Sequence, residues 1–277
     1  MGAAEYVRGG SDGPGSHQRC IGVDGVANEQ RSEARVLGSK GREKALAHRV
    51  LERRERAAVT LQPQASVDRL RSLATVEWTP TAATLIASGA EGATLRELAF
   101  ARGAVVNAAQ ALGLAERMVR IAVDYASTRQ QFGRAIGSYQ ALKHHMADVQ
   151  VQLEYARPVV YAAAARLAEV AAGVSGGDVT SSAVGEAGAN GKAATSALLA
   201  RLNAVVSGAK LMAMEAADMA GRKGIQLHGA MGYSWEVDLH FYVKRAWALA
   251  GSWGDRCWHQ RRLESLVLEE SVVEAVL

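Results

Sequence analysis

The chain has 277 residues and is 49% hydrophobic, which is enough to bury one large core or two small ones. It contains only four prolines and 5% aromatic residues, and alanine is abundant after residue 93, so long helices are favoured over sheets. The two cysteines, Cys20 and Cys257, form neither a CxxC motif nor a metal-ligand spacing. We therefore expect no metal site and a reducing, cytoplasmic location.

The formal net charge is +4, and much of the excess comes from lysines and arginines between residues 31 and 56. Residues 1–58 begin with a Gly-, Ser-, Asp- and Asn-rich stretch and then carry only a thin apolar stripe, which predicts a poorly ordered basic segment. Such a segment can bind nucleic acid or an anionic membrane, but a solvated tail or helix is the simpler explanation. No window reaches the roughly 18 consecutive apolar residues of a membrane span. We expect neither a nucleic-acid nor a membrane partner.

Residues 59–92 differ in character from the rest of the chain. They mix Val, Thr, Leu and Trp with two prolines, a composition typical of short strands or extended segments. This stretch is the β candidate of the chain.

A helical pattern with apolar residues on one face begins near residue 93. It predicts helices over about 94–127, 139–172, 190–222, 237–250 and 255–270, with a glycine-bearing loop at 224–236. Long helices joined by short loops pack as antiparallel neighbours. The predicted fold class is all-α, an antiparallel four-helix bundle preceded by a short irregular or β segment.

Two motifs flank these helices, YASTRQQFGRAIGSYQALKHHMADV at 125–149 and GIQLHGAMGYSWE at 224–236. Their residues, order and spacing resemble the C-terminal helical domain of the acyl-CoA dehydrogenase family, over about residues 93–265. The resemblance assigns residues 93–277 to that domain and residues 59–92 to a linker or a remnant of the family's β domain. The family's N-terminal and middle domains are largely without a counterpart in the chain.

The resemblance implies FAD as cofactor and names its contacts. Arg129, Gln130 and Phe132 would contact flavin, with the arginine pairing the pyrophosphate through its fork of donors. Gln226 and Gly229 would meet the cofactor of a partner subunit, because glycine lets backbone approach a phosphate. Position 230 is alanine where the family usually has a second glycine.

The catalytic base is the main departure from the family pattern. The family places a glutamate at one of two positions, which correspond here to Gly254 and Gly103, and neither residue can take a proton. Asp255 is the nearest carboxylate and a candidate base, although it also suits the N-cap of the last helix, and Glu97 lies upstream. The catalytic residue is therefore left unassigned.

Two functions follow from the resemblance. The first is FAD-dependent α,β-dehydrogenation of an acyl-CoA thioester in lipid or sterol degradation, within an oligomer and with an electron-transfer flavoprotein as a possible acceptor. The alternative is a non-catalytic or truncated subunit that completes the flavin site of a full-length homologous partner. The two glycines favour the alternative, and the acyl group, the electron acceptor and activity of the chain alone stay open.

Overall fold

The computed structural model describes residues 51–52, 60–77, 85–176 and 189–268. By its internal contacts the chain divides into two units, Met1–Leu37 and Gly38–Leu277, and all described residues belong to the second. The predicted poorly ordered segment 1–58 therefore lies outside the described residues, apart from Leu51 and Glu52.

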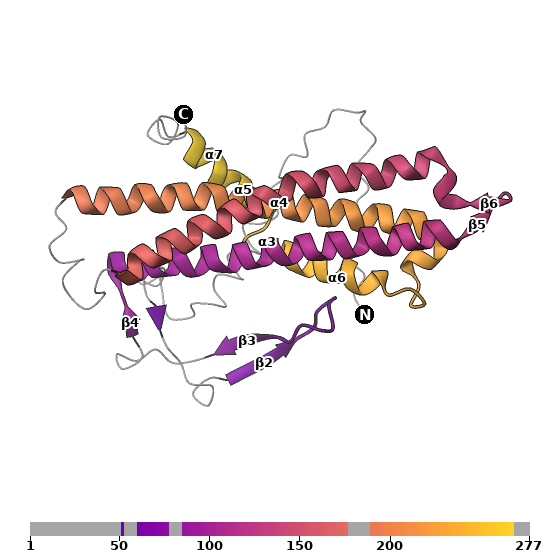
Figure 1. Ribbon diagram of the computed structural model, residues 1–277. Coiled ribbons are helices and arrows are strands. Elements are labelled where there is room, and N and C mark those ends of the chain that lie inside the picture. Colours follow the sequence, from indigo (N-terminus) through magenta and orange to yellow (C-terminus); the bar gives the residue numbers. More distant parts are fainter. Residues whose placement is uncertain (1–50, 53–59, 78–84, 177–188, 269–277) are drawn as a thin grey trace, which may run out of the picture. The chain divides into compact units, whose positions relative to one another are not determined.

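Three long helices form the body of this unit. They are α3 (Gly89–Thr128), α4 (Gln140–Gly176) and α5 (Ala189–His228), and they run side by side (Figure 1). The shorter α6 (Leu239–Ala250) packs against α3 and α5, and α7 (Arg256–Leu268) packs against α5. The predicted all-α bundle is confirmed, with each helix within a few residues of its expected start.

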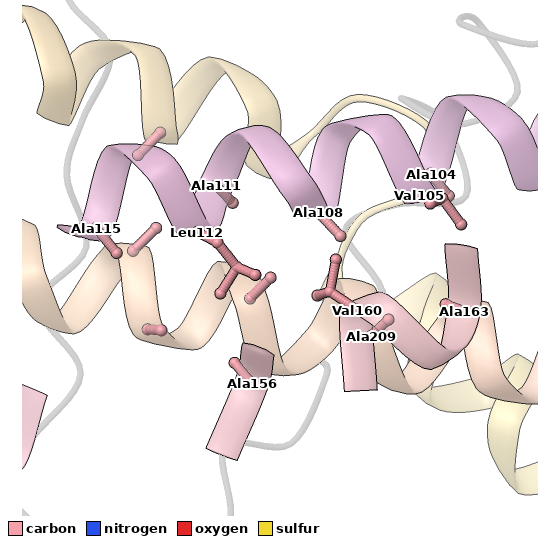
Figure 2. Packing of buried hydrophobic residues seen from close by; sticks show 14 of the residues in the cluster. Ala104, Val105, Ala108, Ala111, Leu112, Ala115, Ala156, Val160, Ala163 and Ala209 are labelled. Carbon is pink, nitrogen blue, oxygen red and sulfur yellow. The ribbon is translucent and has the colours of Figure 1, made fainter. Parts of the chain in front are cut away.

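Small side chains let the three helices approach closely. Figure 2 shows alanines of α3 meeting Ala156, Val160 and Ala163 of α4 and Ala209 of α5. Ala104, Ala108, Ala111 and Ala115 recur every three or four residues on α3, and all four are completely buried. The alanine periodicity of the sequence is thus the packing surface of the bundle.

Short strands form in the predicted β segment. β2 (Thr60–Gln64) pairs antiparallel with β3 (Leu73–Glu77), and β1 (Leu51–Glu52) pairs antiparallel with β4 (Leu85–Ala87). A third antiparallel pair, β5 (Gln130–Gln131) with β6 (Arg134–Ala135), makes a hairpin between α3 and α4. The 3-10 turn η3 (Ile136–Ser138) leads from this hairpin into α4.

The end of the third long helix differs from the prediction. Gly224 was expected to end that helix and open a loop, but α5 continues to His228 and is followed by the 3-10 turn η4 (Gly229–Tyr233). A Cβ at 224 would lie 3.3 Å from the Leu239 side chain, so this glycine inside α5 allows close packing against α6. Gln226 therefore lies on a helix.

Two segments are long and apolar enough, by length and composition, to cross a membrane: Gly89–Thr128 and Ala197–Tyr233. The sequence prediction was that no window reaches about 18 apolar residues, whereas these two segments pass on mean hydropathy over an 18-residue window. In the first segment, 50% of the most apolar 18-residue window is buried within the protein; in the second segment, 39% of that window is buried. Burial of this kind is found in core helices of soluble proteins.

Candidate functional site

The two positions where the family pattern expects a base both lie close to aromatic side chains of the segment 253–259. Gly103 is on α3, and Gly254 is in the turn that joins α6 to α7. A Cβ built on Gly103 would lie only 2.2 Å from Cδ2 of Trp253. The indole therefore occupies the space that any side chain at position 103 would need.

Glycine is also required at position 254. Trp253 and Gly254 both adopt the left-handed backbone conformation, with φ of 58° and 88°. A Cβ at 254 would lie 2.7 Å from the Trp258 ring and 2.9 Å from Nε2 of His259. A glutamate at either position would require this turn to be rebuilt.

Side chains from three distant segments fix the turn after α6. Nζ of Lys210 donates hydrogen bonds to the carbonyl oxygens of Leu249 (2.8 Å) and Ser252 (3.1 Å), and Nδ2 of Asn107 donates to the same two oxygens. Nη1 of Arg71 donates to Oγ of Ser252 at 2.9 Å. Together these donors bind the end of α6 and the turn that follows it from three different parts of the chain.

Lys210 is the largest fully buried side chain, with 1% of its surface exposed. It forms no salt bridge to a carboxylate among the described residues, so the negative end of the α6 dipole serves as its counter-charge. Burial, with a smaller effect of the Arg71 charge, lowers the pKa of Lys210 to about 8. The ammonium stays mostly protonated at neutral pH and remains a full donor.

His259 completes the polar core behind the turn. Its Nε2 lies 2.9 Å from the carbonyl oxygen of Trp253, which can only accept, so Nε2 carries the proton. Its Nδ1 then accepts from the hydroxyl of Ser207 at 3.1 Å. Burial lowers the pKa of His259 to about 4, and the charges of Lys210 and Arg262 act in the same direction. The imidazole is neutral and both its nitrogens are bonded.

The two carboxylates nearest the expected base positions are already engaged. Oδ1 of Asp255 accepts a hydrogen bond from the backbone N–H of Trp258 at 2.7 Å, which is the N-cap of α7 expected from the sequence. Glu97 forms an ion pair with Arg262, whose guanidinium also lies 4.8 Å from the Trp258 ring centroid. Neither carboxylate is free to act as a base in this arrangement.

The predicted flavin-contact residues of the first motif lie at the far end of α3. Arg129 is the C-cap of α3, and both it and Gln130 are exposed, with no ion pair to Arg129 among the described residues. Phe132, expected either to contact flavin or to enter the core, is 92% exposed with a φ of 53°. Its ring meets Tyr139 edge-on at 6.5 Å. The core alternative for Phe132 is wrong.

The residues of the second motif lie near the same end of the bundle. Leu227, next to Gln226, packs in one small cluster with Ala126 and with Ile136, which directly follows the hairpin. Gly229 has a φ of +59°, and no atom lies within 4 Å of where its Cβ would be. The structure thus brings the two predicted contact segments together and places them at a distance from Gly103.

Charged side chains around these segments are also partnered. Arg245 forms an ion pair with the buried Asp68, and Nζ of Lys244 lies 4.1 Å from the Trp235 ring centroid. His145 accepts a hydrogen bond at Nδ1 from Nζ of Lys223 at 2.9 Å.

Sequence reasoning missed the polar core of the turn. Helical periodicity expects apolar residues at three buried positions that are polar: Asn107 of α3, and Ser207 and Lys210 of α5. On α5, the neighbouring Val206, Ala209 and Ala213 are all buried. Polar residues inside an apolar helix face were the available signal. They mark groups that must find buried hydrogen-bond partners.

The contact between Gly103 and Trp253 predicts strong coupling between these positions. Gly103→Ala should lower the free energy of unfolding by about 2 kcal/mol, because the new methyl group overlaps the indole. In a Trp253→Ala background the same change should cost little, which a double-mutant cycle by urea unfolding will measure. Gly113→Ala is the control, since that glycine of α3 faces open space and the change should stabilise slightly. Additive effects of Gly103→Ala and Trp253→Ala would refute the contact.

The neutral His259 predicts a specific pH dependence of stability. Its pKa of about 4 lies below the ordinary value of 6.5, so the unfolded chain takes up a proton that the folded chain does not. The contribution of this pKa difference to the free energy of unfolding is roughly 3 kcal/mol; it is complete above pH 6.5 and is lost as the pH falls toward 4. His259→Gln should remove it, so the two unfolding free energies should converge with acidification. Parallel curves for wild type and variant would show that His259 titrates normally.

Comparison with known proteins agrees with this geometry. The family model described as "Acyl-CoA dehydrogenase, C-terminal domain" matches residues 90–250, more than half of the chain. The chain is 38% identical over 166 residues to acyl-CoA dehydrogenase IpdE2 of Mycobacterium tuberculosis, covering 60% of this chain and 42% of that protein. It is 33% identical over 208 residues to IpdE2 of Mycolicibacterium smegmatis, covering 75% of this chain and 53% of that protein.

Solved structures show the same fold. The ChsE4-ChsE5 complex of Mycobacterium tuberculosis aligns with a TM-score of 0.59 and 23% identity, over 76% of this chain and 50% of that chain. This chain spans about half the length of the curated relatives that it matches. The match to the family model covers nearly all of the three long helices, the hairpin and α6, and it ends before the turn that carries Trp253.

Proposed function

Because the chain belongs to the acyl-CoA dehydrogenase family, we propose that it is the non-catalytic, flavin-completing subunit of an acyl-CoA dehydrogenase assembly. In this assembly a full-length homologue supplies the base for FAD-dependent α,β-dehydrogenation of an acyl-CoA thioester. The observation that carries the proposal is the indole of Trp253, which fills the side-chain space at Gly103. An active site of this type needs a proton acceptor beside the acyl chain.

The groups around Trp253 support a scaffold rather than a catalytic centre. His259 is neutral and bonded through both nitrogens, Asp255 caps α7, and Glu97 is paired. A group that already caps a helix or neutralises a guanidinium loses stability if it moves to accept a substrate proton. Independent dehydrogenation by this chain, the other function that the sequence suggested, is disfavoured because both candidate bases, Asp255 and Glu97, already hold partners.

The hairpin end has the properties that a dinucleotide contact requires. When bound, FAD supplies the hydride acceptor that the dehydrogenation needs. The Arg129 guanidinium is exposed and can offer a pyrophosphate two parallel donors, and the exposed ring of Phe132 can cover a flat apolar group. At Gly229 the open space and positive φ leave the backbone accessible to a close ligand.

The separation along α3 supports an assembly of at least two chains. Gly103 and Arg129 are 26 residues apart, nearly all of them helical, and this corresponds to about 39 Å along the axis. One flavin ring cannot lie beside both residues. The hairpin therefore serves a cofactor other than the one that would lie near Trp253, as expected if a partner subunit holds it.

Flavin retention will test the proposal. The chain should be purified alone and with a co-expressed full-length homologue, and flavin absorbance and its bleaching by acyl-CoA recorded for both. Flavin should appear only in the mixture, and Arg129→Ala should weaken its retention roughly ten-fold or more through loss of charge-assisted bonds to phosphate.

Arg120→Ala is the matched control, because Arg120 is an exposed arginine of the same helix that pairs with Glu116. It should leave flavin retention unchanged. Flavin and turnover from the lone chain would contradict the proposal, and equal retention in the Arg129→Ala and Arg120→Ala complexes would remove the role of Arg129.

A further inference from the structure

An aromatic pair links the two segments at the hairpin end. Tyr125 lies in the last turn of α3, and His228 is the last residue of α5. Their rings stack with centroids 4.3 Å apart and planes inclined by 21°. His228 is buried, so the stack lies under the surface that carries Arg129 and Gly229.

Tyr125 and His228 are each bonded close to the contact segment on their own side, the first through its backbone and the second through its ring. The backbone N–H of Arg129 donates to the carbonyl oxygen of Tyr125 at 2.9 Å, which ends α3 and starts the hairpin. Nδ1 of His228 lies 2.8 Å from the carbonyl oxygen of Gly224, and because a carbonyl can only accept, Nδ1 carries the proton. This bond holds the imidazole in one orientation, directly before Gly229.

The turn η4 folds back onto the same pair. A Cβ at Gly232 would lie 2.6 Å from the carbonyl oxygen of Ile225 and 3.1 Å from Cβ of His228, so only glycine lets the turn approach this closely. The Tyr125 hydroxyl lies 4.0 Å from Sδ of Met231. The pair is thus contacted by α3, by α5 and by the turn.

A small apolar cluster accompanies the ring pair. Its buried members are Ala122, Ala126, Ile136 and Leu227, and Tyr125, Tyr139, Leu142 and Met146 pack against it. Two of the four buried residues are alanines, which make few contacts each. The stack of Tyr125 on His228 joins two large rings directly between the ends of α3 and α5.

We propose that the Tyr125–His228 stack is a positioning element that holds the Arg129 hairpin and the Gln226–Gly229 end at the spacing at which both contact one dinucleotide. This inference rests on the proposed function. Tyr125 and His228 need not touch the cofactor, because they act through the placement of Arg129 and of the backbone at Gly229.

The test uses variants that keep or remove the flat contact. Tyr125→Phe and His228→Phe keep a ring at each position, whereas Tyr125→Ala and His228→Ala remove one. In the complex with the full-length homologue, the alanine variants should raise the Kd for FAD roughly five-fold, the effect expected from losing an aromatic pair. The phenylalanine variants should stay within about two-fold of wild type, as should Tyr155→Ala, an exposed tyrosine of α4.

Combining variants separates a positioning role of His228 from a purely structural role. If His228 acts by placing the hairpin, His228→Ala should add little to the loss of affinity already caused by Arg129→Ala. Full additivity of the two losses would overturn the inference, as would an unchanged Kd in both alanine variants.

Hydrogen exchange keeps the inference testable even if no form of the protein binds FAD. In the flavin-free chain, His228→Ala changes a residue of α5. It should nevertheless speed amide exchange across residues 129–139 several-fold, because the hairpin loses its support. Tyr155→Ala should leave that segment unchanged. Absence of FAD binding together with faster exchange would reject the proposed function and keep the link between the two segments, whereas unchanged exchange would reject the link itself.

Discussion

The contact between the Trp253 indole and Gly103 is the constraint on which the rest of this structure depends. The ring occupies the position where a side chain from α3 would project, so residue 103 must be glycine. The ring reaches that position because the turn adopts two consecutive left-handed residues, and the second of these must be glycine to avoid Trp258 and His259. An aromatic ring and the two glycines at the expected base positions thus belong to one packing arrangement.

The turn keeps this shape because buried donors bind its carbonyl groups. A tryptophan in the left-handed region costs of order 1–3 kcal/mol unless the surroundings fix it. Lys210 and Asn107 bind the carbonyls of Leu249 and Ser252, and His259 binds that of Trp253. A buried ammonium without a carboxylate is tolerated here because it lies at the negative end of α6. These donors hold the turn in one shape from the side of the bundle.

Much of this could be read from the sequence, and the failures have physical causes. Alanine periodicity predicted the helices, and the position of Asp255 before α7 predicted its capping bond. Gln226 was assigned to a loop because a glycine often ends a helix, whereas Gly224 allows α5 to pack closely on the Leu239 side chain. The two expected base positions were recognised as glycine from the sequence, but the Trp253 indole fills the side-chain space at Gly103 through a contact across 150 residues of chain. Lys210 was missed because helical periodicity does not reveal which carbonyls a buried donor will meet.

The central claim is that this chain contributes to the flavin site but supplies no base. It is tested most directly in a complex with a full-length homologue whose own base glutamate has been replaced by glutamine, by following flavin bleaching after acyl-CoA is added. The account predicts that this complex retains flavin and that bleaching is abolished, because nothing on the Trp253 side can accept the α-proton. Bleaching that persists in this complex and disappears on Asp255→Asn in this chain would contradict the account, since it would identify a base here.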